Sequence, residues 1–169
     1  FTFLKNLIET MVEKNNGKKV VILAHSLGTR ATHYFLRFAE KNYGREWISK
    51  NVHTWMAIGP LFLGAPKSVR AVLSGERMGL DAFLYEHEGI DLTRKCGSTC
   101  WMFPYKTPEY SFDSYANIRG PDGKHQPSDF GEALLQSDCK NIYDNLQQNY
   151  LGDPLFGSEE DNLKAPPVD

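Results

Sequence analysis

The chain has 169 residues, of which 41% are hydrophobic and 24% charged, the composition of one globular unit and not of a disordered or fibrous protein. Nineteen lysines and arginines stand against 21 aspartates and glutamates, and because the basic residues are scattered, we expect no nucleic-acid partner. The longest aliphatic run, residues 20–24, is far shorter than the roughly 20 residues that cross a bilayer, so any membrane anchor is expected outside these residues.

Hydrophobic spacing near the start of the chain predicts a helix, a strand and a second helix. The first amphipathic helix covers residues 4–12 and ends at Asn15-Asn16-Gly17, whose residues readily adopt the left-handed conformation. The β-branched run at residues 20–24 predicts a strand buried on both faces of a parallel sheet. The second helix begins near Thr29 and ends at Gly44.

A polar connection containing Trp47 and Ile48 then leads to a second predicted strand, residues 52–58. Strands that alternate with helices favour a right-handed parallel sheet and therefore an α/β fold. Because two strands are few for such a sheet, we expect it to be completed by sequence outside these residues.

The second half of the chain predicts fewer regular elements. A short helix at residues 69–73 precedes a stretch rich in glycine, proline and aromatic residues, 74–127, where we expect little regular structure. Ser128 is a suitable cap for a helix over residues 129–150, and the tail at 152–169 is expected to be irregular.

Three cysteines, Cys96, Cys100 and Cys139, are too few for a disulfide scaffold and lack the second pair that a zinc site needs. We therefore expect neither a metal nor another cofactor. A disulfide between Cys96 and Cys100 would suit an oxidising compartment, but free or buried thiols are an equally good interpretation, so the redox compartment stays open.

The five residues Ala24-His25-Ser26-Leu27-Gly28 lie between a predicted strand and a predicted helix, which is the setting of a nucleophile elbow. Small residues flank the serine because a Cβ two positions before or after it would crowd so sharp a turn. Such a turn exposes the Ser26 hydroxyl as a nucleophile and places the Leu27 backbone N–H at a helix N-terminus, where it stabilises an oxyanion. The alternative is that Ser26 is an ordinary helix N-cap.

A serine nucleophile of this kind needs a carboxylate and a histidine base, in the chain order Ser, Asp or Glu, His. The first four histidines lie beside Ser26, on predicted regular structure or in a charged stretch: His25, His33, His53 and His87. His125, after Asp113 or Asp122, has the right order but no strand before it. We therefore expect the acid and the base downstream of Asp169.

Several blocks together resemble the lecithin:cholesterol acyltransferase family, and within it the phospholipid:diacylglycerol acyltransferases. The elbow His25-Ser26-Leu27-Gly28 is similar to the family's His-Ser-Leu/Met-Gly. The run Gly59-Pro60-Leu61-Phe62-Leu63-Gly64-Ala65-Pro66-Lys67, followed by Ser74-Gly75-Glu76, resembles the most specific pair of family signatures. Weaker likenesses are found at residues 47–52, 98–104, 153–155 and 165–166.

The resemblance implies an α/β-hydrolase fold that is present here in part. Residues 1–76 would form a piece of the core, and residues 77–169 a lid or cap insertion with the connection to the rest of the core. The family's acid, base and second oxyanion donor fall outside these residues, so this segment is not expected to be a complete enzyme.

The resemblance also implies an O-acyltransferase of lipid metabolism. Ser26 would take a fatty acyl chain from a phospholipid and pass it, at a membrane surface, to diacylglycerol or a sterol, which makes triacylglycerol or a sterol ester. The implied location is the lumen of the endoplasmic reticulum, with secreted and lysosomal forms as alternatives. Two other functions stay open: a phospholipase or lipase, if water replaces the alcohol, and an inactive lipid-binding module.

Three sets of residues around the predicted elbow have two interpretations each. Trp101, Met102 and Phe103, with further aromatic residues at 105–115, would line an acyl groove or touch the bilayer, or form a small aromatic core. Lys67 and Arg70 would meet phosphate or be solvated helix residues. The run at 59–66 is better explained as the tight exit from a core strand than as a substrate contact.

Overall fold

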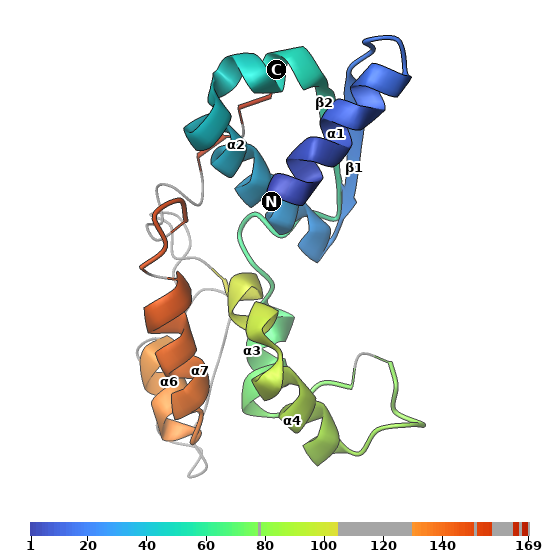
Figure 1. Ribbon diagram of the computed structural model, residues 1–169. Helices are drawn as coiled ribbons and strands as arrows, with labels where there is room; N and C mark the ends of the chain where they lie inside the picture. Colours follow the sequence, from blue (N-terminus) through green and yellow to red (C-terminus); the bar gives the residue numbers. More distant parts are fainter. Residues whose placement is uncertain (78, 105–129, 151, 157–163, 166, 169) are drawn as a thin grey trace. The chain divides into compact units, whose positions relative to one another are not determined.

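The computed structural model describes residues 1–77, 79–104, 130–150, 152–156, 164–165 and 167–168. These residues belong to two compact units, Phe1–Phe62 with Glu160–Asp169, and Leu63–Glu159 (Figure 1). The units divide after Phe62, whereas the division expected from the sequence falls after Glu76. The interpretation of residues 77–169 as a lid or cap insertion stays a prediction.

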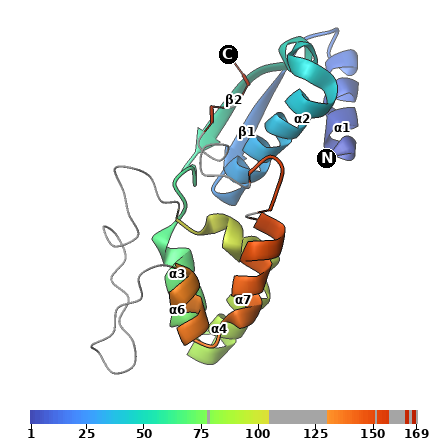
Figure 2. The ribbon, with the colours of Figure 1, turned by 90° about the vertical axis from the view of Figure 1, so that its left-hand side faces the viewer.

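The first unit is a parallel two-stranded sheet with two helices packed on one of its faces (Figure 2). Its elements, in chain order, are α1 (Thr2–Lys14), β1 (Val20–His25), α2 (Leu27–Asn51) and β2 (Val52–Ile58). α1 ends where predicted, because Asn16 and Gly17 take positive φ angles of 55° and 77°. β1 and β2 pair in parallel, with Leu23 opposite Met56, so both predicted strands and their pairing are confirmed.

A hydrophobic core lies between the helices and the covered face of the sheet. Both helices and both strands contribute buried side chains to it: Ile8, Val12, Val20, Phe35, Leu36, Ala39, Ile48 and Val52. Burial of these side chains is what stabilises two helices of such different length on so small a sheet.

The other face of the sheet is exposed, so the expectation of a first strand buried on both faces is wrong for this structure. Val21 and Leu23 of β1, and Met56 and Ile58 of β2, each expose half or more of their surface. An uninterrupted apolar strand indicates that both faces suit apolar neighbours. It does not say which segment of the chain supplies them.

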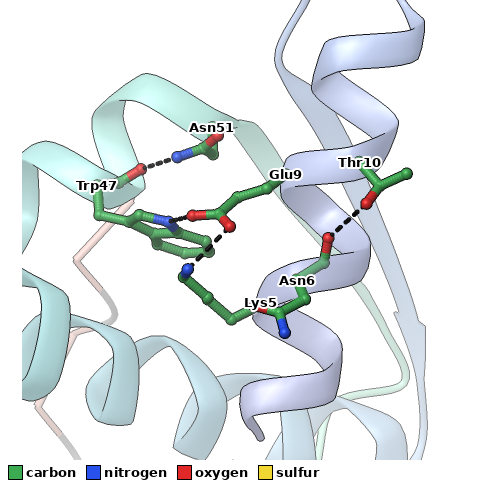
Figure 3. A network of polar contacts seen from close by, with 6 residues as sticks. All are labelled: Lys5, Asn6, Glu9, Thr10, Trp47 and Asn51. Atoms are coloured by element: carbon green, nitrogen blue, oxygen red, sulfur yellow. Dashed lines mark hydrogen bonds and ion pairs between the residues drawn. The ribbon is translucent and has the colours of Figure 1, made fainter.

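α2 is bent at Gly44, whose φ and ψ of 81° and 163° are not helical. The helix resumes after the bend and carries Trp47 and Ile48, so the predicted polar connection is in fact helical. Trp47 Nε1 donates a hydrogen bond to Glu9 Oε1 at 2.8 Å, and Lys5 Nζ donates to Glu9 Oε2, also at 2.8 Å (Figure 3). This network joins α2 to α1 and gives Trp47 a structural role.

The second unit is helical in the residues that the structure describes (Figure 2). Its elements are α3 (Pro66–Leu73), α4 (Glu86–Lys95), the 3₁₀ helix η1 (Gly97–Met102), α6 (Phe130–Gln136), α7 (Lys140–Asn145) and the π-helical turn η2 (Leu146–Tyr150). α3 confirms the short helix predicted there. Side chains from α3, η1, α6 and α7, and from the residues next to them, form a separate core: Val69, Val72, Cys100, Phe103, Leu134, Cys139 and Ile142.

α4 and η1 lie where we expected little regular structure, and for them that expectation is wrong. α4 is held to α3 mainly by polar side chains. Thr93 Oγ1 donates to Ala71 O, and Arg94 Nε donates to Val72 O, both at 3.0 Å, so carbonyls at the C-terminal end of α3 are satisfied by α4. A helix held in this way lacks the apolar periodicity from which helices are predicted.

The helix predicted over residues 129–150 is divided near Asp138, which has a φ of 56°. Cys139 N donates to Leu134 O at 2.8 Å, and this bond closes α6 before α7 begins. The apolar spacing continues across the break at Cys139 and Ile142, which are buried, whereas Leu135 is half exposed. Ser128 and Asp129, the predicted cap and first residue, lie outside the described residues.

Candidate active site

Ser26 occupies a sharp turn between β1 and α2. Its φ of 52° and ψ of -124° lie in a region that residues other than glycine rarely adopt, so the backbone is strained there. An ordinary N-cap has an extended backbone and a side-chain bond to the first turn of its helix. Within the described residues Ser26 makes no such capping bond, and the geometry therefore favours the nucleophile-elbow interpretation.

Hydrogen bonds on both sides of the turn hold this strained conformation. Ser26 N donates to Ile58 O at 3.0 Å, which ties the turn to the end of β2. Ser26 O accepts from Thr29 N at 2.9 Å and from Thr29 Oγ1 at 2.6 Å. Thr29 Oγ1 also accepts a hydrogen bond from Leu61 N at 3.3 Å, so Thr29 holds the loop after β2 as well. This role of Thr29 was not predicted, and its only signal in the sequence is a hydroxyl residue three positions after the serine.

Leu27 is the first residue of α2, so its N–H is among the four at the start of a helix that have no partner inside the helix. The helix dipole adds a positive potential at this end. Both properties allow the Leu27 N–H to stabilise an oxyanion that forms when Ser26 attacks a carbonyl group. Its role as an oxyanion donor stays a prediction.

The flanks of the turn are less tight than predicted. A Cβ built on Gly28 would lie 4.0 Å from the Cβ of Ala24, which is an ordinary van der Waals contact. A methyl group at both positions therefore fits. A branched side chain at either one would press against the other, so the requirement is for small residues and not for the absence of a Cβ.

No histidine of the described residues is hydrogen-bonded to Ser26. His25 and His53 are exposed on the strands, and His87 is exposed and stacked on Tyr85 with ring centroids 5.7 Å apart. His125, Asp113 and Asp122 lie outside the part of the chain that the structure describes. The expectation that the acid and the base follow Asp169 stays a prediction.

His33 is buried on α2, and its Nε2 donates a hydrogen bond to Lys164 O at 2.9 Å. Its ring centroid lies 6.0 Å from that of Trp55 and 6.1 Å from that of Phe62. Burial lowers the pKa of His33 to about 4. The ring is therefore neutral at pH 7, and it holds the chain at Lys164 against α2.

The three residues predicted for an acyl groove differ in their surroundings. Phe103 is buried in the core of the second unit, which for this residue favours the alternative of a small aromatic core. Trp101 and Met102 are half-buried, and the Trp101 ring lies 6.2 Å from the ring of Tyr150. Their place in a groove stays a prediction, and residues 105–115 lie outside the described residues.

Two segments that resemble the family, the signature run at residues 59–67 and the weaker likeness at 98–104, meet backbone to backbone. Gly64 has a φ of 81°, and a Cβ there would overlap Phe103 O and lie 2.5 Å from Pro104 Cα. Ala65 N donates to Met102 O at 2.7 Å. Gly64 is therefore required by a close approach of two main chains, a role that needs no substrate contact.

Lys67 and Arg70 are exposed on α3 and also face a carboxylate. Lys67 Nζ lies 3.5 Å from Glu76 Oε1, and Arg70 Nη1 lies 4.0 Å from Glu76 Oε2. A phosphate at this position would have to compete with Glu76. The solvated interpretation of the two basic residues agrees with this arrangement.

The three cysteines are free thiols in the structure. Cys96 is exposed, with its Sγ 3.1 Å from Ser98 Oγ, and this hydrogen bond lowers the pKa of the Cys96 thiol. Cys100 and Cys139 are buried in the core of the second unit, and burial raises the pKa of Cys100 to about 11.

Among the described residues, none of the helices is both long and apolar enough to cross a membrane.

The chain is similar in sequence to a known protein family and to several of its members. The model of a family described as lecithin:cholesterol acyltransferase matches residues 1–163. The chain is similar to the phospholipid:diacylglycerol acyltransferase of Schizosaccharomyces pombe, with 33% identity over 121 aligned residues that cover 62% of this chain and 19% of the relative. It is similar to the phospholipid–sterol O-acyltransferase of Arabidopsis thaliana, with 30% identity over 110 residues that cover 62% and 17%.

The lysosomal phospholipase A and acyltransferase of Bos taurus is 28% identical over 133 residues, which cover 77% of this chain and 30% of the relative. The chain therefore spans less than a third of the length of each of these three relatives.

Proposed function

The chain belongs to the lecithin:cholesterol acyltransferase family, and from this premise we propose that it carries the nucleophile of a phospholipid-dependent O-acyltransferase with an α/β-hydrolase fold. The single observation that supports the proposal best is the strained Ser26 turn at the start of α2, with a φ of 52°. The names of the relatives support the substrate classes: a phospholipid as acyl donor, and diacylglycerol or a sterol as acceptor.

The proposed reaction has two steps. Ser26 Oγ attacks the ester carbonyl of the phospholipid while its proton passes to a general base, and the Leu27 N–H stabilises the oxyanion. The lysophospholipid alkoxide leaves with that proton, and the acyl chain remains on Ser26 as an ester. The acceptor alcohol then attacks this ester and gives its proton to the base, which passes it to Ser26 Oγ as triacylglycerol or a sterol ester leaves, so that the serine hydroxyl is restored.

The proposal predicts an activity that depends on one oxygen atom. The full-length protein is incubated with mixed vesicles of labelled phosphatidylcholine and diacylglycerol, and the lipid products are separated. We expect labelled triacylglycerol, and at least about a thousandfold less of it from Ser26→Ala, because no other residue replaces a nucleophile of this kind. Ser49→Ala is the matched control, because Ser49 is exposed on α2 and is expected to change the rate little.

Each other result has a definite meaning. Labelled fatty acid alone would identify a phospholipase or lipase, since water would then be the acceptor. Binding of lipid without any product would identify an inactive lipid-binding module. Product formation that is unchanged in Ser26→Ala would refute the elbow assignment itself.

We propose that the protein works in the lumen of the endoplasmic reticulum, the location that the resemblance to phospholipid:diacylglycerol acyltransferases implies. The lysosome is an alternative, because a bovine relative is named for that compartment, and secretion is a second one. Protease protection of the tagged full-length protein on isolated microsomes tests this location. Digestion of the protein in sealed microsomes would contradict it.

A further inference from the structure

Thr29 lies in the first turn of α2, and its side chain is fully buried, at 0% exposure. A buried hydroxyl group needs hydrogen-bond partners, and this one both donates to Ser26 O, at 2.6 Å, and accepts from Leu61 N, at 3.3 Å. The first bond alone is common, because a threonine in a helix often bonds back to a carbonyl three or four positions earlier. The second bond joins segments 32 positions apart and has no such local explanation.

The carbonyl that Thr29 binds is part of the proposed oxyanion site. Ser26 O and the Leu27 N–H belong to the same peptide group, which is trans. A trans peptide group is planar, and its C=O and N–H point in opposite directions. A contact that fixes the direction of Ser26 O therefore also fixes the direction of the Leu27 N–H.

Two donors of Thr29 hold Ser26 O. The backbone N–H of Thr29 lies 2.9 Å from it and the side-chain Oγ1 2.6 Å, so both lone pairs of this carbonyl are used. The peptide plane cannot rotate without breaking one of these bonds. Hydrogen bonds to the oxygen of a peptide group also polarise its N–H, which makes the Leu27 N–H a stronger donor.

The strain at Ser26 makes this support necessary. A serine with a φ of 52° stays in that conformation only while its surroundings hold it there. Without the Thr29 hydroxyl, the bonds from Ser26 N to Ile58 O and from Thr29 N to Ser26 O remain, and these end the strand and begin the helix. Loss of the hydroxyl should therefore disturb the peptide plane more than the elements on either side of it.

The second bond of the hydroxyl extends this support to the loop after β2. The loop starts at Ile58, whose O accepts from Ser26 N at 3.0 Å. Three positions later Leu61 N returns to Thr29 Oγ1. The loop is thus attached to the turn at two points, and Thr29 is the side chain that makes one of them.

We propose that the Thr29 hydroxyl positions the oxyanion donor. It fixes the Ser26–Leu27 peptide plane through Ser26 O, and it ties this plane to the loop after β2 through Leu61 N. Because its side chain is fully buried, Thr29 acts through Ser26 and Leu27 and is a positioning residue. The inference rests on the proposed function, since the oxyanion forms when Ser26 attacks an ester. It goes beyond that function by assigning the direction of the donor to one side-chain oxygen.

The first experiment removes this oxygen and keeps the shape of the side chain. Full-length Thr29→Val is assayed on vesicles of acyl-labelled phosphatidylcholine with diacylglycerol, and every labelled product is counted. We expect kcat to fall at least about tenfold and KM to stay within about twofold, because an oxyanion donor acts in the transition state and loss of a whole donor costs about 100- to 1000-fold. Thr29→Ser keeps the hydroxyl and should retain kcat within about threefold.

Ile48→Val is the matched control for a loss of stability. Ile48 is buried on the same helix, with 1% exposure, and this change removes one carbon atom and no polar group. It should lower the thermal midpoint but keep kcat within about twofold of the parent. If Thr29→Val does not fold, Thr29→Ser is compared with Thr29→Ala, because these two variants differ from each other only by the hydroxyl oxygen.

A second measurement separates positioning from a general structural role. A trifluoromethyl ketone that carries an acyl chain forms a tetrahedral adduct with a nucleophilic serine, and its oxyanion uses the same donor as the reaction. In Thr29→Val its inhibition constant should rise by about the factor by which kcat/KM falls. In Ile48→Val and Thr29→Ser it should stay within about threefold of the parent value.

The results distinguish this inference from the proposed function. A Ser26-dependent enzyme in which Thr29→Val keeps its kcat would overturn the inference alone. So would a loss of kcat without a change in the inhibition constant, or a loss confined to KM. A parent that forms no Ser26-dependent product would refute the proposed function, and the inference with it.

Discussion

His33 is a titratable group enclosed by α2 and by the chain near Lys164. Burial disfavours its charged form, and the nearby charges of Arg30 and Arg37 also lower its pKa, while its bond to Lys164 O acts in the opposite direction. The sequence shows only a histidine among apolar helix positions. Its partner lies 131 positions further along the chain, so no local pattern contains this interaction.

We predict that His33 makes the stability of the protein depend on pH. The pKa is about 4 in the folded protein, against an ordinary 6.5 in the unfolded chain, so between these values the unfolded state binds more protons. The free energy of unfolding should therefore fall by about 1 to 3 kcal/mol as the pH drops from 6.5 to 4. Urea unfolding across this range measures it.

His33→Gln is the matched variant for this measurement. Its amide keeps a donor for Lys164 O but does not titrate, so this part of the pH dependence should disappear. An equal slope of stability against pH in both proteins would contradict the role of His33.

At the scale of an element, the start of α3 depends on a contact between main chains. Gly64 combines a positive φ with the backbone of Phe103 and Pro104 in the place where a Cβ would go. α4, in turn, depends on side chains that bond to the carbonyls of α3. Neither feature is a matter of helix propensity, so each element is stabilised by its neighbour more than by its own sequence.

Gly64→Ala separates this contact from the backbone conformation alone. Gly79 has nearly the same φ, 82° against 81°, but no atom lies within 4 Å of a Cβ built there. We expect Gly79→Ala to cost about 1 kcal/mol of unfolding free energy, and Gly64→Ala about 3 kcal/mol or more. Both alanines would have a strained positive φ, but only the Cβ at position 64 would overlap other main-chain atoms. Chemical denaturation of both variants provides the comparison, and equal losses would refute the contact.

At the scale of the whole molecule, the residues that the structure describes form two hydrophobic cores. The buried side chains of the first unit and those of the second form separate clusters without a common member. Ile48 and Ile142 are a matched pair for a test of this arrangement. Ile48 exposes 1% of its surface in the first cluster, and Ile142 exposes 2% in the second.

We expect Ile48→Val and Ile142→Val each to lower the free energy of unfolding by about 0.5 to 1.5 kcal/mol. Because the two clusters share no buried residue, the double variant should lose the sum of the two within about 0.5 kcal/mol. Equilibrium unfolding of the four proteins measures the difference. A coupling above about 1 kcal/mol would show that the two cores act as one.

The sequence by itself determined the alternation of helices and strands up to Ile58, the parallel pairing, α3 and the place of Ser26 at a strand-to-helix turn. These features are local: they follow from apolar spacing, from residues that take positive φ, and from small residues around a serine. The sequence also predicted the family, because the family's signatures are continuous runs of residues.

Only the tertiary structure decided which atoms hold the turn and which elements hold one another. Thr29 bonds to Ser26 and to Leu61, Glu9 binds Trp47 across two helices, and α4 is held by polar bonds to α3. The same is true of the exposed face of the sheet and of the break near Asp138. The physical reason is that hydrogen bonds and close contacts between distant segments leave no periodic trace in the sequence, whereas the burial of one face of a helix does.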